Sequence, residues 1–511
     1  MTPANSGNPV PVAAPGVLLA RNSLLNLIGQ AAPMLVAVAA IPPLIAGLGT
    51  ERFGVLALAW MAIGYFGVFD LGLSRALTKL VAEKLGARSD AELAELIWTA
   101  LLLMVALGVA GALLLAVLTP WLVGGVLKIP ALLEAESRSA FYLLAFSLPW
   151  VISTGGLRGV LEANQRFDLV NLVRLPLGIF TYLGPLLVLP FSRSLPAVVG
   201  ILVAARLIAW LAHLLLCLRA IPAMRRSVRP QLSVARPLVR FGSWMTVSNL
   251  VSPLMVYLDR FVIGATISMS AVAFYVTPYE LVTRLWLIPG ALMGVLFPAL
   301  SATWTRDTPR MGALFDGGVR IVFLMILPVT LLLTTFAPEG LTLWLGADFA
   351  RESTAVLRWL AVGVYLNSIG QVAFAAVQGI GRPDVTGKLH LAELVPYLAL
   401  LWWATARWGI EGAAIAWVGR VALDTVLLFA LADRLVGEPV ARVRRSLLLV
   451  AGGLALIAVS VLPETVMVKA VFAAVVLPLF ALAGWRHVLA FGERQLVRSA
   501  LTTRVPAPSA S

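Results

Sequence analysis

The sequence predicts an all-α membrane protein with about 14 transmembrane helices, on three observations. Of its 511 residues, 60% are hydrophobic and only 13% are charged, whereas soluble domains carry roughly 25% charged residues. The mean hydropathy is +0.94. Apolar runs of membrane-spanning length also follow one another along the chain. A water-soluble fold could not bury so much apolar surface, so the chain is expected to cross the membrane many times.

The spans are located as runs of roughly 20 apolar residues bounded by charges or by Pro and Gly clusters. A first group of six is predicted at 20–47, 52–71, 93–119, 138–162, 168–190 and 195–219. A second group of six is predicted at 238–266, 271–299, 317–337, 354–380, 386–406 and 411–436, followed by a final pair at 445–463 and 467–489. Between the first two spans and the third, residues 71–86 alternate apolar and basic side chains at helical spacing. This segment is expected to be an amphipathic helix that lies on the inner leaflet as an anchor.

The Lys and Arg residues indicate the orientation. With the N-terminus placed inside, 27 of the 39 Lys and Arg residues fall in inside segments and nine in outside segments. Short cytoplasmic loops carry such an excess. Both termini are therefore expected to be cytoplasmic, and the alternation supports the number of spans. The formal charge of +14 is spread over short clusters with no continuous stripe, so nucleic acid is not an expected partner.

An approximate internal repeat at an offset of 216 residues divides the chain. Residues 160–175 overlay residues 376–391, so that Arg166 falls on Arg382 and Asp168 on Asp384. The expected domains are a disordered cytoplasmic tail (1–16), an N-lobe (17–220), a basic cytoplasmic linker (221–237), a C-lobe (238–440), a final helix pair (441–490) and a second tail (491–511). Six spans per lobe predict lobes related by an axis along the membrane normal. Such repeats are typical of transporters that work by alternating access, with the substrate between the lobes.

Several segments resemble the polysaccharide transport, or oligosaccharide flippase, family within the multidrug, oligosaccharidyl-lipid and polysaccharide exporter superfamily. The resemblance covers about residues 20–490. It is carried by GLGTERFGVLALAWMAIGYFGVFDLGLSRALTKLVAEKLG (Gly47 to Gly86), RGVLEANQRFDLVNLVR (Arg158 to Arg174), LDRFVIG (Leu258 to Gly264), QGIGRPDVTGKLHLAEL (Gln378 to Leu394) and EGAAIAW (Glu411 to Trp417).

This resemblance implies export of a polyprenyl-diphosphate-linked oligosaccharide across the bacterial inner membrane, for O-antigen, capsule or exopolysaccharide assembly. It also implies membrane lipids, a polysaccharide polymerase and glycosyltransferases as partners, a monomer, and no cofactor. Whether a proton or sodium gradient drives export is left open. Two rivals remain: a cation-coupled drug exporter of the same superfamily, which would need an acidic aromatic cavity, and a membrane polysaccharide polymerase or glycosyltransferase, which would need a large outer loop.

Ionisable residues inside the spans are the candidate site residues, because charge within a membrane is costly and usually faces a cavity or a partner. Arg260 and Arg284 are the first candidates to bind the diphosphate, since the planar guanidinium matches phosphate oxygens. They lie near Asp259 and Glu280 in the sequence. The alternative is that ion pairs of Arg260 or Arg284 with Glu280 only tie helices together.

Further charges form two more groups. Arg158 and Arg174 are further candidates to bind the diphosphate. With Asp70, Arg75 and Glu162 they are predicted to lie at the cytoplasmic mouth of the cavity, or else to anchor span ends at the interface. Glu393, Arg420 and Asp424 lie within the C-lobe spans, the last two at i, i+4 spacing. The acidic residues that could bind a coupling ion are Asp70, Asp259, Glu280, Glu393 and Asp424, and spacing does not select among them. No Walker motif or metal-ligand cluster occurs, so the protein is expected not to be an enzyme and to bind no metal.

Overall fold

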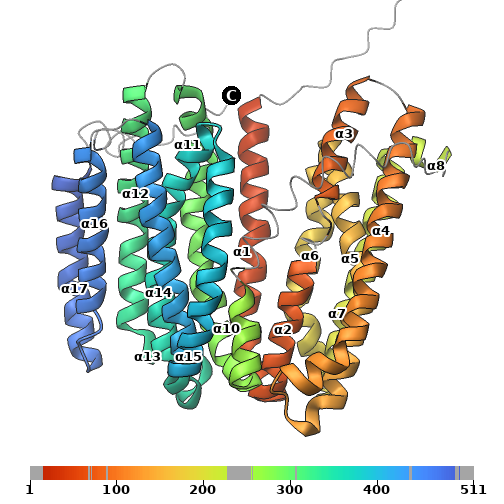
Figure 1. Ribbon diagram of the computed structural model, residues 1–511, viewed down its shortest axis with the longest axis horizontal. Helices are drawn as coiled ribbons and strands as arrows, with labels where there is room; N and C mark the ends of the chain where they lie inside the picture. The colour runs from red at the N-terminus through yellow and green to blue at the C-terminus, as the bar shows by residue number, and fades with distance from the viewer. Residues whose placement is uncertain are drawn as a thin grey trace, which may run out of the picture. The chain divides into compact units, whose positions relative to one another are not determined.

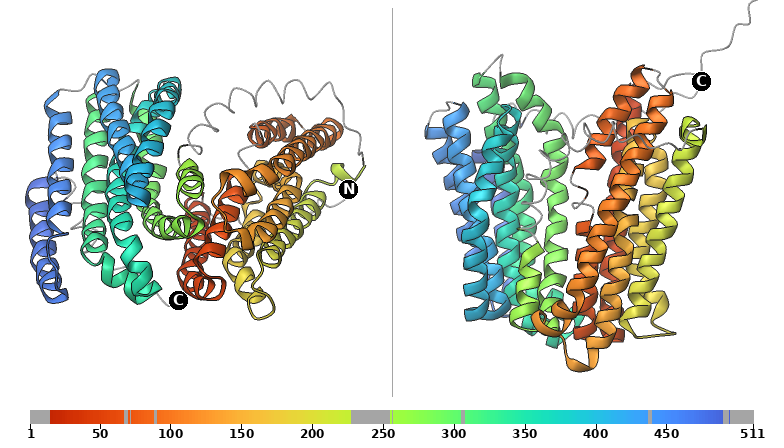
Figure 2. Two further views of the ribbon diagram at one scale, coloured as in Figure 1. Left: turned by 60° about the horizontal axis from the view of Figure 1, so that its bottom comes forward. Right: turned by 45° about the vertical axis from the view of Figure 1, so that its right-hand side comes forward.

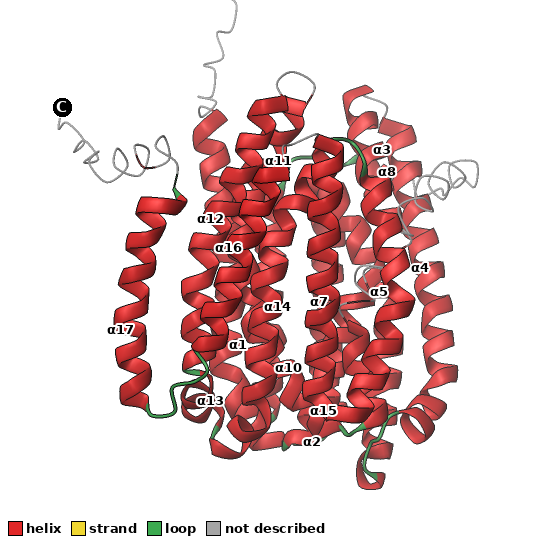
Figure 3. Ribbon diagram, turned by 60° about the vertical axis from the view of Figure 1, so that its left-hand side comes forward, coloured by secondary structure: helices red, strands yellow, loops and turns green. Residues whose placement is uncertain are grey.

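A computed structural model describes residues 15–66, 70, 72–87, 90–226, 255, 257–304, 308–436, 440–489 and 494. Within these ranges the regular structure is entirely helical (Figure 3). Nine helices of this described part are long and apolar enough to cross a membrane, and two shorter apolar helices, Ala32–Leu48 and Ser446–Val459, add to them. The expected all-α membrane architecture is confirmed.

The chain forms two compact units, residues 1–253 and 254–511. In the first unit the long helices run roughly parallel to one another (Figure 1). Its elements are α1 (Pro15–Leu48), α2 (Thr50–Phe66), α3 (Leu73–Ala87), α4 (Asp90–Trp121), a π-helical turn (Leu122–Val126), α5 (Ala131–Ala163), α6 (Phe167–Val188), α7 (Leu195–Ala220) and α8 (Ala223–Arg226).

Helix α4 shows why these sequences form spans. Its acidic residues lie in the first two turns, and the following residues are almost all apolar. Thirty-two helical residues rise about 48 Å, more than the roughly 30 Å of bilayer hydrocarbon. Leu113, Leu114 and Val117 are more than 60% exposed. An outward face of this kind suits lipid, in which every backbone polar group must be satisfied within the helix.

Helix α3 differs from the expected surface anchor. Its apolar residues Leu77 and Val81 are fully buried, and the helix packs against α4 and α5. The apolar face therefore contacts protein and is not available to a lipid surface. In Figure 1, α2 and α3 occupy opposite ends of the same unit, so that together they make one interrupted crossing. The polar face of α3 is exposed at Lys79 and Glu83, and its first turn lines a polar cavity, described below.

The second unit begins, in its described part, with residue 255 and the helical residues 257–266. It continues with α10 (Met269–Thr283), a 3₁₀ turn (Arg284–Trp286), α11 (Leu287–Trp304), α12 (Thr308–Thr335), α13 (Ala337–Leu345), α14 (Ala347–Gly379), α15 (Pro383–Val436), α16 (Val440–Val459), α17 (Val466–Ala483) and a π-helical turn (Gly484–Val488). Residues 238–254 of predicted span 7, most of the expected linker 221–237, residues 1–14 and nearly all of the expected tail 491–511 lie outside the described residues.

Helix α15 contains two spans. Its helical geometry is interrupted at Trp408 (φ −125°, ψ 15°) and Gly409 (φ 62°, ψ −144°), where only glycine adopts the second conformation without strain. The two halves then pack closely, because a Cβ placed on Gly412 would lie 2.0 Å from the carbonyl oxygen of Ala404. The separate spans predicted at 386–406 and 411–436 are thereby confirmed.

The internal repeat is visible in the backbone of two turns, one in each unit. Arg166 N–H donates to Leu161 O, and Arg382 N–H donates to Val377 O, at the same offset of 216 residues. Gln165 (φ 57°) and Gly381 (φ 84°) take the same left-handed conformation before these arginines. Each arginine then pairs in bidentate fashion with the aspartate two residues later, Asp168 or Asp384.

The second span of each unit is also interrupted at equivalent positions. The break between Phe66 and Leu73 separates α2 from α3, and the 3₁₀ turn Arg284–Trp286 separates α10 from α11. The offset of 216 residues places the second break on the first. The two units thus share the turn before α6 or α15 and a broken second span, which supports an ancestral duplication.

The last two helices pack on α12 of the second unit (Figure 2). Lys469 of α17 is 3% exposed and donates to Glu339 of α13 at 2.6 Å. Burial acts to raise the pKa of Glu339, but the hydrogen bond from Lys469 and neighbouring positive charge outweigh it and lower that pKa below its usual value. Thr334 of α12 also hydrogen-bonds Ser460, after α16, at 2.8 Å. Polar contacts therefore attach α16 and α17 to the core of the unit.

Candidate functional site

A polar cavity of about 520 Å³ lies within the first unit. Its walls come from α2, α3, α5, α6 and α7. Four arginines contribute to its lining, one from each of the last four of these helices: Arg75, Arg158, Arg174 and Arg206. We call this space the arginine cavity. Asp70, at the break between α2 and α3, and His213 of α7 also line it.

The break in the second span positions the start of α3 in the cavity wall. Asp70 is buried, and its two carboxylate oxygens accept from Gly72 N at 2.9 Å and Ser74 N at 3.1 Å. These bonds satisfy orphan amides at the start of α3, as a helix cap does. Gly155 lets α5 approach this turn, since a Cβ there would lie 2.7 Å from Ser74 Oγ. The carboxylate of Asp70 therefore serves the backbone and leaves the arginines largely unneutralised.

The cavity carries a net positive charge. Arg158 forms an ion pair with Glu162 at 3.4 Å. Within the described part of the chain, Arg75, Arg174 and Arg206 have no hydrogen bond or ion pair. Unpaired guanidinium groups at membrane depth are costly and are found where they line a water-filled cavity or meet an anion. The arrangement is suited to binding an anion with several oxygens, such as a diphosphate.

The structure brings together Asp70, Arg75, Arg158 and Arg174, which the sequence had grouped at one mouth. It adds Arg206, which sequence reasoning left unassigned inside a span. The available signal was its place in the apolar run of α7, flanked by alanine and leucine, since an arginine is rarely tolerated there without a function. The binding roles of these residues stay predictions.

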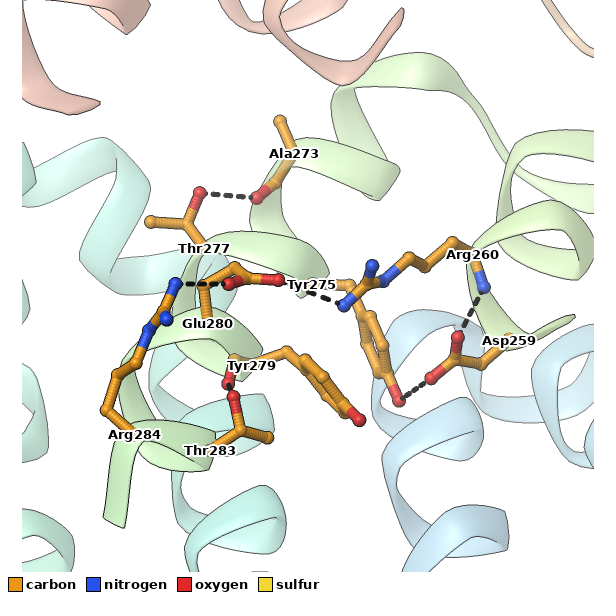
Figure 4. Close-up of polar contacts among 9 residues, drawn as sticks. All are labelled: Asp259, Arg260, Ala273, Tyr275, Thr277, Tyr279, Glu280, Thr283 and Arg284. Atoms are coloured by element: carbon orange, nitrogen blue, oxygen red, sulfur yellow. Dashed lines mark hydrogen bonds and ion pairs between the residues drawn. The ribbon is translucent and has the colours of Figure 1, made fainter. Parts of the chain in front are cut away.

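A second polar cluster lies in the other unit, around Arg260 (Figure 4). Asp259 is fully buried, and it accepts from the hydroxyl of Tyr275 at 2.7 Å and from the backbone amide of Arg260 at 2.7 Å. The Arg260 side chain is 2% exposed and donates to Glu280 at 3.3 Å. Arg284 donates to the other oxygen of Glu280 at 2.9 Å. Glu280 therefore bridges the two arginines first considered for the diphosphate.

Aromatic rings cover the Arg260 guanidinium. Its central carbon lies 4.9 Å from the ring centroid of Tyr257 and 4.7 Å from that of Tyr279, within range of cation–π attraction. Tyr279 in turn contacts Trp417 of α15 with ring centroids 5.9 Å apart. Arg260 thus already has a carboxylate and two aromatic rings as partners, although its buried Nε has no hydrogen bond in the described residues, while Arg284 and Glu280 are about one-third exposed. This geometry favours the structural alternative for Arg260, and the diphosphate role of both arginines stays a prediction.

A third cluster joins the two halves of α15. Arg420 lies 3.4 Å from Glu393 and 3.9 Å from Asp424, and His390 lies 3.5 Å from Asp424. Both carboxylic residues are 5% exposed. Among the described residues, Glu393 contacts Arg420 as an ion pair without a well-formed hydrogen bond, and the buried hydroxyl of Tyr397 has no hydrogen-bond partner. Two carboxylates against one arginine leave an excess of acidic groups that a bound cation or proton would balance.

None of these clusters forms a metal site in the described residues, where no group of three His, Cys, Asp or Glu side chains is close enough to hold an ion. The arrangement of charges is instead that of a membrane transporter, with a cationic cavity in one helical unit and buried acid–arginine networks in the other.

The fold is shared with solved transporters. A structure titled "Lipid II flippase MurJ, inward closed conformation" superposes with a TM-score of 0.67 over 91% of this chain and 99% of that chain, at 12% identity. An inward-facing multidrug resistance MATE family transporter of the MOP superfamily gives a TM-score of 0.66 over 80% of this chain and 98% of that one, at 15% identity. At these identities the likeness concerns the fold alone.

Sequence comparison defines the family. The profile of the family described as "Polysaccharide biosynthesis protein" matches residues 19–304, more than half of the chain. A Shigella flexneri protein named "Putative O-antigen transporter" is 33% identical over 408 residues, which cover 80% of this chain and 96% of the relative. The chain belongs to this polysaccharide biosynthesis family of multi-pass membrane proteins, as the resemblance had indicated.

Proposed function

We propose that the protein is a flippase that moves a polyprenyl-diphosphate-linked oligosaccharide from the cytoplasmic to the outer leaflet of the bacterial inner membrane, by alternating access. Family membership supports this function, and so do the relatives named as an O-antigen transporter and a lipid II flippase. The glycan would be used for O-antigen, capsule or exopolysaccharide assembly, with a polymerase and glycosyltransferases as its partners in that process. No catalytic step is assigned to the chain.

The arginine cavity is the structural observation that supports this proposal most directly. A diphosphate crossing hydrocarbon needs cationic hydrogen-bond donors in place of water, and guanidinium groups bind phosphate oxygens in bidentate geometry. Arg75, Arg174 and Arg206 are free of protein partners in the described residues, whereas Arg260 is buried against Glu280 and two tyrosines. We therefore assign the diphosphate first to the arginine cavity, with Arg284 as the candidate in the other unit.

The positive charge of the residues that line the cavity distinguishes a flippase for an anionic substrate from the main alternative, an exporter of cationic drugs. An exporter of cationic drugs would need acidic groups facing its substrate, but the one aspartate that lines the arginine cavity is engaged by backbone amides. A membrane polymerase or glycosyltransferase would need catalytic acids in a large outer domain. The predicted outer loops are short, and α13 and the π-helical turn after α4 occupy much of them.

The test is reconstitution in proteoliposomes with a fluorescently labelled polyprenyl-diphosphate oligosaccharide. Wild-type protein should move the label between leaflets, and Arg174→Ala and Arg206→Ala should each reduce the initial rate by about tenfold or more, since a charge-assisted hydrogen bond contributes roughly 1.5–3 kcal/mol. Arg174→Lys should restore part of the rate, because it retains charge without the planar fork.

Arg351→Ala is the matched control, since Arg351 is exposed and pairs only with Asp348 of its own helix in the described structure. It should leave the rate unchanged. Absence of movement by the wild type, with correct insertion, would contradict the flippase function. Full activity in both alanine variants would contradict the assignment of the diphosphate to this cavity.

A further inference from the structure

An apolar groove of about 530 Å³ runs between α6 and α7 of the first unit. One wall is α6, with Leu172, Pro176 and Phe180. The other wall is α7, where Ala204, Ala205 and Ala212 leave room that larger side chains would fill. Leu172 and Ile208 at its rim are more than 60% exposed. The groove is therefore open to the surroundings of the unit and lined almost entirely by hydrocarbon.

The groove and the arginine cavity share a wall. Leu177 of α6 and Ala209 of α7 line both spaces. The same two helices also supply Arg174 and Arg206 to the cavity, at positions adjacent in sequence to the groove residues Val173 and Ala205. On both α6 and α7, an arginine that lines the cavity is therefore next to an apolar residue that lines the groove. A ligand that reached both spaces would have to be a phosphate or diphosphate joined to a long hydrocarbon chain.

We propose that this α6–α7 groove binds the first isoprene units of the polyprenyl chain while the diphosphate occupies the arginine cavity. The inference rests on the proposed function and adds a second contact site to it. A head group that enters a polar cavity inside the helix bundle must leave its tail somewhere, and exposing that tail to the polar lining would be unfavourable. A groove open on its outer side lets the tail continue into the bilayer without crossing the cavity.

Ordinary lipid is the competing occupant, because phospholipid chains are as apolar as the groove. The small residues on α7 distinguish it from a simple lipid-facing surface, since they form a recess where the methyl-branched isoprenoid has space to pack. Van der Waals fit, rather than hydrophobic transfer, must then supply the selectivity inside a membrane.

The first experiment fills the groove. Ala205→Phe places a ring in the recess, and Leu211→Phe is the control, since Leu211 lies on the same helix, is 50% exposed and does not line the groove. In nanodiscs, binding of undecaprenyl diphosphate and of inorganic diphosphate, which carries no isoprene unit, is measured for each protein. Ala205→Phe should weaken binding of the long-chain compound by about tenfold, the size of a typical overpacking cost, and leave binding of inorganic diphosphate within about twofold.

The second experiment does not depend on whether Ala205→Phe folds. A photoreactive benzophenone residue replaces Ile208 at the groove rim or, in the control, Leu211. Illumination should crosslink undecaprenyl diphosphate at position 208 and not at 211, and excess phospholipid should not compete.

Equal crosslinking at both positions, or full competition by phospholipid, would show bulk lipid in the groove and overturn the inference. If Ala205→Phe binds undecaprenyl diphosphate as tightly as the wild type does, the inference is overturned as well, and the proposed function stands. Failure of the wild type to bind either diphosphate would instead count against the proposed function.

Discussion

At the scale of single residues, the structure separates arginines that are paired from arginines that are not. Arg260 is buried and has the partly exposed carboxylate of Glu280 and two tyrosine rings as partners, so its charge is balanced within the protein. Arg174 and Arg206 line a cavity without such partners in the described chain. Both kinds look alike in the sequence, because each is an arginine in an apolar run. Their chemistry differs because a neighbouring helix supplies Glu280 in one case only.

Replacement of Glu280 tests the structural role of this pairing. Glu280→Ala leaves Arg260 buried without this carboxylate. Breaking a fully buried ion pair costs about 3–5 kcal/mol, and the cost here is smaller because Glu280 itself is partly exposed. We expect a clear fall in the thermal unfolding temperature of the detergent-solubilised protein. Glu352→Ala, at an exposed position of α14, should unfold at the wild-type temperature. Wild-type stability of Glu280→Ala would mean that the Arg260 charge does not depend on Glu280.

At the scale of elements, breaks in helices decide where the polar groups lie. The break between α2 and α3 places Asp70 at the start of a helix and allows α3 to turn Arg75 toward the cavity. The break at Trp408 and Gly409 folds α15 back on itself, which brings Glu393 of one half against Arg420 of the other. A single unbroken helix could not form the contact between Glu393 and Arg420, since residues that far apart along one helix axis do not meet.

The close packing within α15 gives a prediction at this scale. Gly412→Ala would place a Cβ 2.0 Å from the carbonyl oxygen of Ala404, so the two halves must separate, at a cost of about 1–3 kcal/mol. Gly452→Ala is the control, because no atom lies within 4 Å of a Cβ there and alanine favours a helix over glycine by up to about 1 kcal/mol. Unfolding in increasing denaturant should show loss of stability in the first variant and none in the second. Equal stabilities would contradict the close approach.

At the scale of the whole molecule, each unit carries a different kind of polar centre. The first has arginines that lack partners in the described part of the chain, and the second has Glu393, Asp424 and Arg420 in a buried network with two carboxylates against one guanidinium. A transporter driven by an ion gradient needs one site for its substrate and one for its ion. The sequence left proton and sodium open as coupling ions, and we expect the α15 network to bind whichever ion is used.

Glu393→Gln tests this division of roles in proteoliposomes. It removes a carboxylate from the network, so an imposed proton or sodium gradient should no longer accelerate transport, while movement of substrate down its own gradient continues. Glu411→Gln is the control, since Glu411 is exposed and bonded to Trp359. Gradient stimulation that survives in Glu393→Gln would exclude Glu393 as a carrier of the coupling ion.

The class of protein, the positions of the spans and the internal repeat were accessible from the sequence, because hydropathy, charge in loops and a fixed offset are properties read along the chain. Apart from α3 and the predicted span 238–266, most of which lies outside the described residues, the long helices overlap the predicted spans, and both Arg-x-Asp turns take one backbone form. The sequence also named Asp70 and three of the four arginines that line the arginine cavity, since charges inside spans are rare.

Tertiary packing decided the rest. Helical periodicity showed that 71–86 has an apolar face, but only the contacts with α4 and α5 show that this face is covered by protein and that the helix completes a broken span. Three further features depend on how helices distant in sequence are rotated against each other. They are the proximity of Arg206 to Arg174, the ion pair between Arg260 and Glu280, and the groove beside the cavity. Rotation about a helix axis is set by packing between elements, and no local pattern records it.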